Sequence, residues 1–364
     1  MIALALSGGG SRAIAFHLGC LRALHDRDVL EKVSVISSVS GGSVIAALYA
    51  YSDSSFEAFD SRVVEILRKG LHRPILRQLF LSPLALGALA TNSIARPLAL
   101  VATACGKTPP FRRWVSRTDA LERALRHELF GDAQLCEVKR PKLATVINAC
   151  ELRTGTAFRF GNQKSGSWRT GEILDNKVSL AHAVACSAAY PMMLPAFDRL
   201  YPFQKGEQVE KKRVLLTDGG VFDNLGTSCL EPGRNDAYSL HVFNPDYIIC
   251  CHAGHGQLSG EGVPFGFPSR AIASVESAFR KVQDAAVHRL HRRASSGQLK
   301  GFVLSYLGQK DSALPFVPPD LVKRDAVFGY PTDFASMKNA DIERISTRGE
   351  LLTRILRAYY CPEV

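Results

Sequence analysis

Hydrophobic residues in the first fifty positions follow two different patterns. Short apolar runs at residues 2–6 (Ile-Ala-Leu-Ala-Leu) and 33–36 (Val-Ser-Val-Ile) are typical of buried strands. Between them, apolar residues recur at helical spacing from Ile14 to Leu24, which predicts a helix over residues 11–26. A second helix is predicted from Gly42 onward. This order of strand, helix, strand and helix predicts a βαβ unit with a right-handed crossover.

The rest of the chain continues this alternation, with one long helical stretch between residues 55 and 130. Because strands alternate with helices, the sequence predicts a three-layer α/β/α sandwich with a mostly parallel central sheet. We expect a single domain, residues 1–364, with a helical insertion at about residues 55–130. Further strands are expected at 143–147, 156–160, 213–217 and 247–251, further helices at 177–187, 269–294 and 346–360, and loops at 200–212 and 253–268.

The insertion contains an apolar stretch, residues 79–104, that is rich in Leu and Ala. It is long enough to span a membrane, but polar and helix-breaking residues interrupt it, which favours two short helices broken near residues 91–97. Such a segment either packs on the main core or dips into a membrane as a lid, and the pattern leaves both open. The interrupting residues are Pro83, Asn92, Ser93, Arg96 and Pro97.

The excess of basic over acidic residues predicts that the protein binds anionic partners. The chain has 45 basic and 34 acidic residues, a net charge of +11, and no acidic residue lies between Glu65 and Asp119. Basic residues flanking apolar sequence favour an anionic membrane surface. Nucleic acid is disfavoured because aromatic residues do not interleave with the basic ones. The basic residues are Arg68, Lys69, Arg73, Arg77, Arg96, Lys107, Arg112, Arg113 and Arg117.

Cysteine usage indicates the compartment. The first strand begins directly after Met1, which leaves no room for a secretory signal, and the nine cysteines are an odd number. We therefore expect reduced thiols in the cytoplasm, with peripheral membrane association. No Cys-x-x-Cys pair occurs, so the spacing predicts no structural metal site, and no cofactor is expected.

Three glycine-containing turns carry candidate chemistry. Residues 7–12 (Ser-Gly-Gly-Gly-Ser-Arg) offer bare backbone N–H groups at a helix start, which suit an oxyanion. Ser40 lies on a sharp strand-to-helix turn, residues 38–42 (Ser-Val-Ser-Gly-Gly), as an exposed nucleophile must. Asp218 follows a strand and precedes Gly219-Gly220, and a carboxylate in a water-poor pocket can act as a general base. Together these turns indicate acyl transfer through serine.

The same three turns resemble the patatin-like phospholipase family, whose pattern is Gly-Gly-Gly-x-Arg, then Gly-x-Ser-x-Gly, then Asp-Gly-Gly. Ser38 departs from the pattern by replacing the first glycine of the second motif. The blocks at residues 152–155 (Leu-Arg-Thr-Gly) and 185–191 (Ala-Cys-Ser-Ala-Ala-Tyr-Pro) are also similar to the family. The C-terminal third resembles bacterial members only loosely.

This resemblance implies roles for particular residues. It implies a Ser40–Asp218 dyad without histidine, an oxyanion hole at Gly8, Gly9 and Gly10, and Arg12 steadying that loop or a lipid phosphate. The implied reaction is hydrolysis of lipid acyl esters, of phospholipase A or lysophospholipase type, through an acyl-serine intermediate and without a metal or cofactor.

Other interpretations of these residues stay open. The order Ser40, Asp218 and then His252 or His255 would suit an α/β-hydrolase triad, although only one strand–helix unit precedes Ser40. A dinucleotide fingerprint at Gly8 is disfavoured because no acidic residue ends the second strand. A membrane-degrading effector with low basal activity, released by a signal, is a further alternative.

Overall fold

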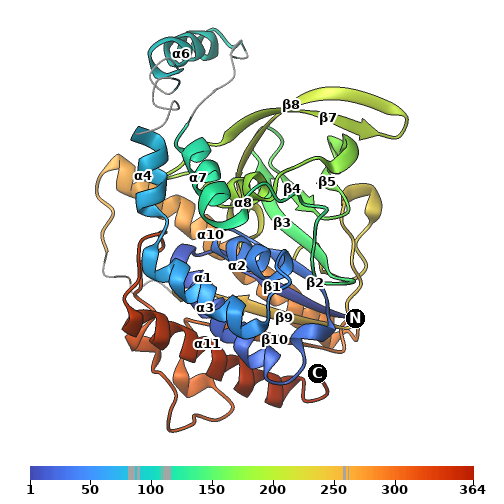
Figure 1. Cartoon of the computed structure of the whole chain (residues 1–364), viewed down its shortest axis with the longest axis vertical. Helices are drawn as coiled ribbons and strands as arrows, with labels where there is room; N and C mark the ends of the chain where they lie inside the picture. Colours follow the sequence, from blue (N-terminus) through green and yellow to red (C-terminus); the bar gives the residue numbers. More distant parts are fainter. Residues whose placement is uncertain (81–86, 88–90, 108, 110–115, 257–259, 261) are drawn as a thin grey trace.

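In the computed structural model, ten strands of the described residues form one mixed sheet between layers of helices (Figure 1). The structure describes the whole chain except residues 81–86, 88–90, 108, 110–115, 257–259 and 261. The strand order is β10-β9-β1-β2-β3-β4-β5-β6-β7-β8, with a further pairing of β3 to β8. The predicted three-layer fold class is confirmed.

One half of the sheet is parallel. Its strands are β1 (Ile2–Leu6), β2 (Val33–Ser38), β3 (Ala144–Glu151), β9 (Tyr247–His252) and β10 (Gly301–Tyr306), paired in the order β10-β9-β1-β2-β3. The strands predicted at residues 2–6, 33–36, 143–147 and 247–251 are present in this half, and β10 is one that the hydrophobic pattern did not predict. Because these strands are covered on both faces, most of their residues are buried, including polar residues of β2 and β3.

Successive residues of β1 face opposite layers, as the two-residue period of a strand requires. Leu4 and Leu6 belong to a large core with α1 (Gly10–His25), α2 (Gly41–Ala50), α3 (Phe56–Lys69) and α11 (Asn339–Tyr360). Ala3 and Ala5 belong to a smaller core with α10 (Phe267–Ser295), and α9 (Gly220–Asp223) packs against α10. The predicted helices over 11–26, 269–294 and 346–360 therefore form the two outer layers.

The other half of the sheet is antiparallel and corrects one expectation. Residues 200–212 are not a loop but part of a long hairpin of β7 (Phe197–Lys205) and β8 (Gln208–Asp218). The hairpin closes with a two-residue turn at Gly206-Glu207. Its tip is exposed to solvent on both faces and is therefore rich in polar residues, which is why the sequence predicted a loop there. The remaining antiparallel strands are β4 (Thr156–Gly161), β5 (Ser165–Ser167) and β6 (Gly171–Ile173).

The described part of the insertion is mostly helical. It contains α4 (His72–Phe80), a π-helical turn η2 (Thr91–Ala95), α6 (Arg96–Ala104) and α7 (Arg117–Leu125), followed by a second π-helical turn η3 (Arg126–Phe130). The predicted break near residues 91–97 coincides with η2 and with Pro97 in the first turn of α6. The expectations for Pro83, Arg112 and Arg113 lie outside the described residues.

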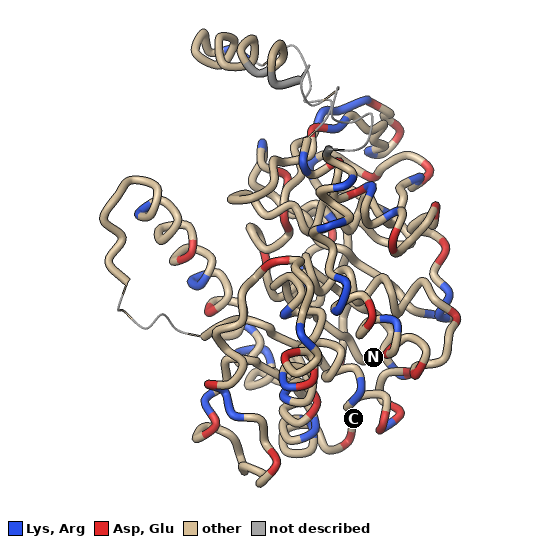
Figure 2. The backbone as a smooth tube through the Cα atoms, turned by 60° about the vertical axis from the view of Figure 1, so that its left-hand side comes forward, with Lys and Arg blue, Asp and Glu red and all other residues tan. Residues whose placement is uncertain are grey.

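Two helical segments stand away from the body of the molecule, namely α6 and the first half of α10 (Figure 2). Among the described residues, no helix is both long and apolar enough to cross a membrane. The remaining elements are α8 (Leu180–Ser187) and the 3-10 turns η1 (Leu30–Lys32), η4 (Leu174–Asn176), η5 (Asp236–Tyr238), η6 (Asp311–Ala313) and η7 (Arg324–Ala326).

Candidate active site

Ser40 lies on a sharp turn between the end of β2 and the start of α2. Its backbone has φ 51° and ψ −120°, a conformation that residues with a side chain rarely adopt. Ser187 at the end of α8 fixes this turn, because its Oγ accepts a hydrogen bond of 2.9 Å from the Ser40 N–H. Gly42 is required because a Cβ there would lie 2.4 Å from the carbonyl oxygen of Leu6. The local geometry is that of a nucleophile elbow.

The other serines near the turn are buried and committed to structural hydrogen bonds. Ser37 Oγ accepts from the Asn148 amide at 2.9 Å, and Ser38 Oγ lies 3.4 Å from the carbonyl oxygen of Val146. Ser43 Oγ pairs with Ser187 Oγ at 2.9 Å. Ser40 differs from all three because it lines a cavity together with the carboxylate of Asp218.

That carboxylate belongs to Asp218, the last residue of β8. Asp218 pairs with Ala149 of β3, which places it at the edge of the sheet where the carboxyl end of β2 also lies. It accepts a hydrogen bond from the Gly220 N–H at 2.7 Å. Burial raises the pKa of Asp218 from 3.8 to about 7, because the nearby Gly220 N–H and Ser40 hydroxyl only partly offset the loss of solvation.

The glycine turn between β1 and α1, residues 8–10, lines the same cavity as Ser40 and Asp218. The N–H of Gly8 donates to the carbonyl oxygen of Asn224 at 3.1 Å, so this group is already engaged. For the N–H groups of Gly9 and Gly10, the described residues provide no acceptor. Gly10 has φ 59°, and a Cβ there would lie 2.2 Å from the carbonyl oxygen of Asp333. Two of the three predicted oxyanion donors are therefore available.

Arg12 lies in the first turn of α1 and is buried. Its Nε donates to the carbonyl oxygen of Ala253 at 2.9 Å, and its Nη1 donates to that of Tyr330 at 2.8 Å and also contacts His255. Burial lowers the pKa of Arg12 to about 10, so it stays protonated near neutral pH. Its contacts hold the loop after β9 and the segment before α11 against the glycine turn.

The two histidines of the alternative triad line the same cavity but bond elsewhere. His252 stacks on Tyr306 with ring centroids 4.5 Å apart, and burial lowers the pKa of His252 to about 3. His255 contacts Arg12, the carbonyl oxygen of Phe328 and the hydroxyl of Thr332. Within the described part of the chain, neither ring has a hydrogen bond to Ser40 or Asp218.

A cavity of about 1580 Å³ brings these groups together. Ser40, Asp218 and the glycine turn line one part of it, and apolar side chains of α4 line another. Arg117 and residues of α10, among them Glu276 and Arg280, also contribute. The apolar lining residues of α4 and of the segment after α8 are Ile75, Leu76, Leu79, Met193 and Leu194.

Three residues of this site were not predicted from the sequence. Ser187 holds the Ser40 N–H, and the backbone carbonyl of Asn224 holds Gly8. The carbonyl oxygen of Asp333 accepts a 2.6 Å hydrogen bond from the Ser11 N–H. Ser187 lay within a recognised motif, whereas Asn224 and Asp333 act through backbone carbonyls, for which side-chain identity gives no signal.

Comparisons with known proteins indicate the family and the fold of this chain. A family model described as Patatin-like phospholipase matches residues 4–228, more than half of the chain. A search of curated proteins found no significant match.

Among solved structures, human GIVD cytosolic phospholipase A2 is similar with a TM-score of 0.55 and 15% identity, covering 98% of this chain and 58% of that chain. Its complex with methyl gamma-linolenyl fluorophosphonate is similar with a TM-score of 0.52 and 16% identity, and the match covers 98% of this chain and 57% of that chain. VipD from Legionella pneumophila is 13% identical with a TM-score of 0.40, and the match covers 99% of this chain and 67% of VipD.

This chain thus spans about 58% of the length of the human enzyme it resembles, and the likeness concerns the fold. With the family model covering most of the sheet and both candidate catalytic turns, the chain belongs to the patatin-like phospholipase family.

Proposed function

We propose that the protein is a serine acyl hydrolase that cleaves lipid acyl esters, of phospholipase A or lysophospholipase type. The observation that carries this proposal is the convergence of Ser40, Asp218 and the glycine turn on one cavity. Ser40 occupies a strained turn, and the pKa of Asp218 is raised to about 7, which suits a general base near neutral pH. Both side chains line one cavity with the glycine turn.

In the acylation step, the Asp218 carboxylate takes the proton of Ser40 Oγ while this oxygen bonds to the ester carbonyl carbon. The carbonyl π electrons move to oxygen, and the N–H groups of Gly9 and Gly10 donate to that oxyanion. The N-terminus of α1 adds the positive end of its dipole. Arg12 acts as a positioning residue, because its contacts are with the loops that hold the glycine turn.

The tetrahedral intermediate then collapses and the bond to the leaving alcohol breaks. Asp218 returns its proton to the departing oxygen, which leaves an acyl group on Ser40. In the second half, Asp218 takes a proton from water as the water oxygen bonds to the acyl carbon. Ser40 Oγ leaves with that proton, and the fatty acid is released. These steps balance with the ester and one water molecule.

The cavity supports a lipid as the substrate. Its apolar wall on α4, with Met193 and Leu194, suits an acyl chain, and a cavity of about 1580 Å³ is larger than most small-molecule sites. Arg117 and Arg280 at the same cavity suit an anionic phosphate. Membership of the family points to the same substrate class.

Labelling with a lipid fluorophosphonate tests the nucleophile directly, since the similar human phospholipase forms a complex with such a compound. We expect the wild-type protein to be labelled at Ser40 and the Ser40→Ala protein to be unlabelled, with ester hydrolysis reduced at least about a thousandfold. Ser37→Ala is the matched control, since Ser37 is buried three residues away, and it should label normally. Labelling that persists in Ser40→Ala, or hydrolysis within a few-fold of wild type, would contradict the assignment.

A separate pair of variants distinguishes the dyad from a histidine triad. In His252→Phe the ring stacking on Tyr306 is retained, and His255→Gln keeps a polar side chain beside Arg12. If Asp218 alone is the base, the double variant keeps kcat within about tenfold of wild type, whereas loss of a triad histidine costs about 10⁴-fold or more. The measurement is steady-state hydrolysis of a soluble ester, with circular dichroism to confirm folding.

A further inference from the structure

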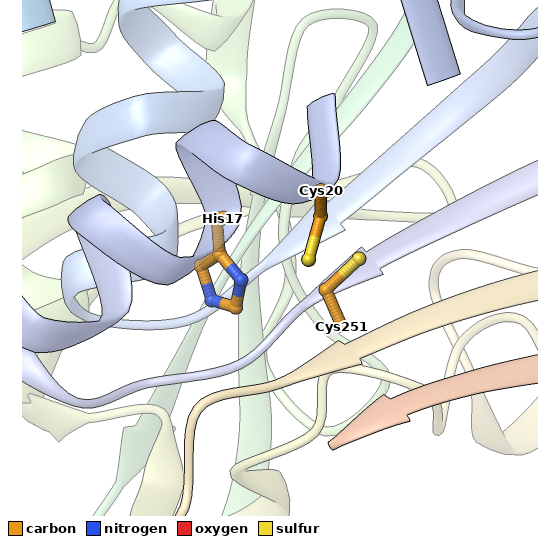
Figure 3. Close-up of side chains that lie close together, drawn as sticks. All are labelled: His17, Cys20 and Cys251. Carbon is orange, nitrogen blue, oxygen red and sulfur yellow. The ribbon is translucent and has the colours of Figure 1, made fainter. Parts of the chain in front are cut away.

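Beneath the glycine turn, the structure brings together His17, Cys20 and Cys251, three residues that the proposed reaction does not use (Figure 3). His17 and Cys20 lie three residues apart on the same face of α1, and Cys251 lies on β9. One ligand atom from each residue lies within 4.8 Å of the other two. All three side chains are fully buried, and none of them lines the catalytic cavity.

The hydrogen bonds of His17 determine which ring nitrogen is available. Nε2 lies 2.9 Å from the carbonyl oxygen of Ser7, and a carbonyl can only accept, so Nε2 carries the proton in the neutral ring. Nδ1 then holds a lone pair and has no hydrogen-bond partner, although it is buried. Figure 3 shows the ring turning this nitrogen toward the two sulfur atoms. A buried polar atom without a partner costs free energy, which a bound ligand at this point would recover.

This hydrogen bond is also the arrangement that metal-binding histidines use. A ligating histidine usually donates its second N–H to a carboxylate or backbone carbonyl, which fixes the tautomer and the ring orientation. Here the Ser7 carbonyl oxygen is the acceptor for the second N–H of His17, and it is in place without a bound ion. Cys20 and Cys251 supply two sulfur atoms, the ligands preferred by thiophilic ions.

We propose that His17 Nδ1, Cys20 Sγ and Cys251 Sγ bind a thiophilic cation, Zn²⁺, with three ligands from the described residues. Charge favours zinc, since two thiolates and a neutral imidazole cancel the charge of Zn²⁺, whereas Cu⁺ would leave a net negative charge in an apolar core. Binding releases the two thiol protons to solvent, and no oxidation or reduction is involved.

The position of the site indicates what the ion does. Ser7 N–H donates to the Cys251 carbonyl at 3.1 Å, and Ser7 Oγ accepts from the Ala253 N–H at 2.9 Å. An ion held by α1 and β9 therefore joins the two elements that carry the glycine turn and the loop bound by Arg12. Its expected effect is on stability, and it is independent of the proposed hydrolase activity.

Metal analysis of the reduced full-length chain tests the site. After incubation with ZnCl₂ and a non-thiol reductant, then removal of free metal, we expect about one zinc per chain and a raised thermal midpoint. Cys20→Ser and Cys251→Ser should each lose the zinc and the zinc-dependent rise in midpoint. Cys250→Ser is the matched control, because Cys250 is also buried on β9 but faces the other core, and it should keep the zinc.

Cobalt(II) substitution of the wild-type protein keeps the proposal testable if a cysteine variant fails to fold. A sulfur-to-cobalt charge-transfer band in the near ultraviolet supports the two thiolate ligands. The proposal is overturned if the reduced wild-type chain binds no zinc or cobalt, or if folded Cys20→Ser and Cys251→Ser chains keep it. It is also overturned if the native protein carries a Cys20–Cys251 disulfide, and binding of Cu⁺ alone overturns the assignment of zinc.

Discussion

At the scale of single residues, the chemistry of the site depends on how burial changes Asp218. Asp218 is 4% exposed, and the Gly220 N–H and the Ser40 hydroxyl recover only part of the hydration that its carboxyl group loses. Its pKa is therefore raised rather than lowered, in contrast to a carboxylate paired with a cation. A base of this kind is ionised at slightly alkaline pH and protonated at slightly acidic pH.

The pH dependence of hydrolysis follows from this pKa. The base must be deprotonated to accept the proton of Ser40, so we expect kcat/KM to fall about tenfold per pH unit below about pH 7 and to be level above it. The measurement is hydrolysis of a soluble ester between pH 5 and 9 by the wild-type chain. A profile that is flat down to pH 5 would show that Asp218 is not the base or that its pKa is not raised.

At the scale of elements, the active site depends on close approach between the glycine turn and the segment that precedes α11. Ser11 N–H donates to Asp333, and Arg12 donates to Tyr330. The backbone of Asp333 lies so near Gly10 that no side chain fits between them. The C-terminal part of the chain, which carries no recognised motif, therefore braces the turn that presents the Gly9 and Gly10 N–H groups.

Substitution of Gly10 tests this bracing. Gly10→Ala combines a positive φ with a Cβ placed 2.2 Å from the Asp333 carbonyl oxygen, so the two backbones must separate. We expect a loss of unfolding free energy above about 2 kcal/mol and a large drop in kcat. The matched control is Gly155→Ala, which has a similar positive φ of 65° but nothing within 4 Å of the Cβ, and it should cost only about 1 kcal/mol. Equal effects of the two changes on thermal unfolding would contradict the account.

At the scale of the whole molecule, two exposed apolar segments protrude beyond the sandwich (Figure 2). On α6, Leu100 and Val101 are 65% and 63% exposed. At the start of α10, Phe265 and Phe267 are 92% and 77% exposed. Solvent-exposed apolar patches on a basic chain are typical of a membrane-contacting surface. The sequence left open whether residues 79–104 pack on the core or meet a membrane, and the exposure of α6 favours the second.

Vesicle co-sedimentation tests this surface. We expect the wild-type chain to bind vesicles that contain anionic lipid more tightly than purely zwitterionic ones, and less tightly at high salt. The double variant Leu100→Glu/Val101→Glu should weaken binding about tenfold or more, because two exposed apolar side chains are replaced by like charges facing anionic lipid.

Val209→Glu is the control for this change, since Val209 is similarly exposed, at 56%, but lies on the β7–β8 hairpin. Binding that shows no preference for anionic lipid, or that falls equally in both variants, would remove the case for α6 as the contact.

Local patterns of this sequence were enough to predict the βαβ start, the parallel strands other than β10, the long outer helices and the three glycine-containing turns. Each of these depends on residues that are neighbours in the chain: a buried strand requires a continuous apolar run, and a sharp turn requires small residues at fixed offsets. Polar composition misled at residues 200–212, because a hairpin with both faces solvated at its tip has the pattern of a loop.

Only the tertiary structure decided which distant groups meet. The carbonyl oxygens of Asn224 and Asp333 reach the glycine turn, and His17 and Cys20 of α1 meet Cys251 of β9, because the order of the parallel strands places β9 beside β1. Cysteine spacing predicted no metal site, since spacing reports only on ligands from one local segment. Burial likewise raised the pKa of Asp218, because the groups packed around the carboxyl group remove more hydration than its sequence neighbour Gly220 restores.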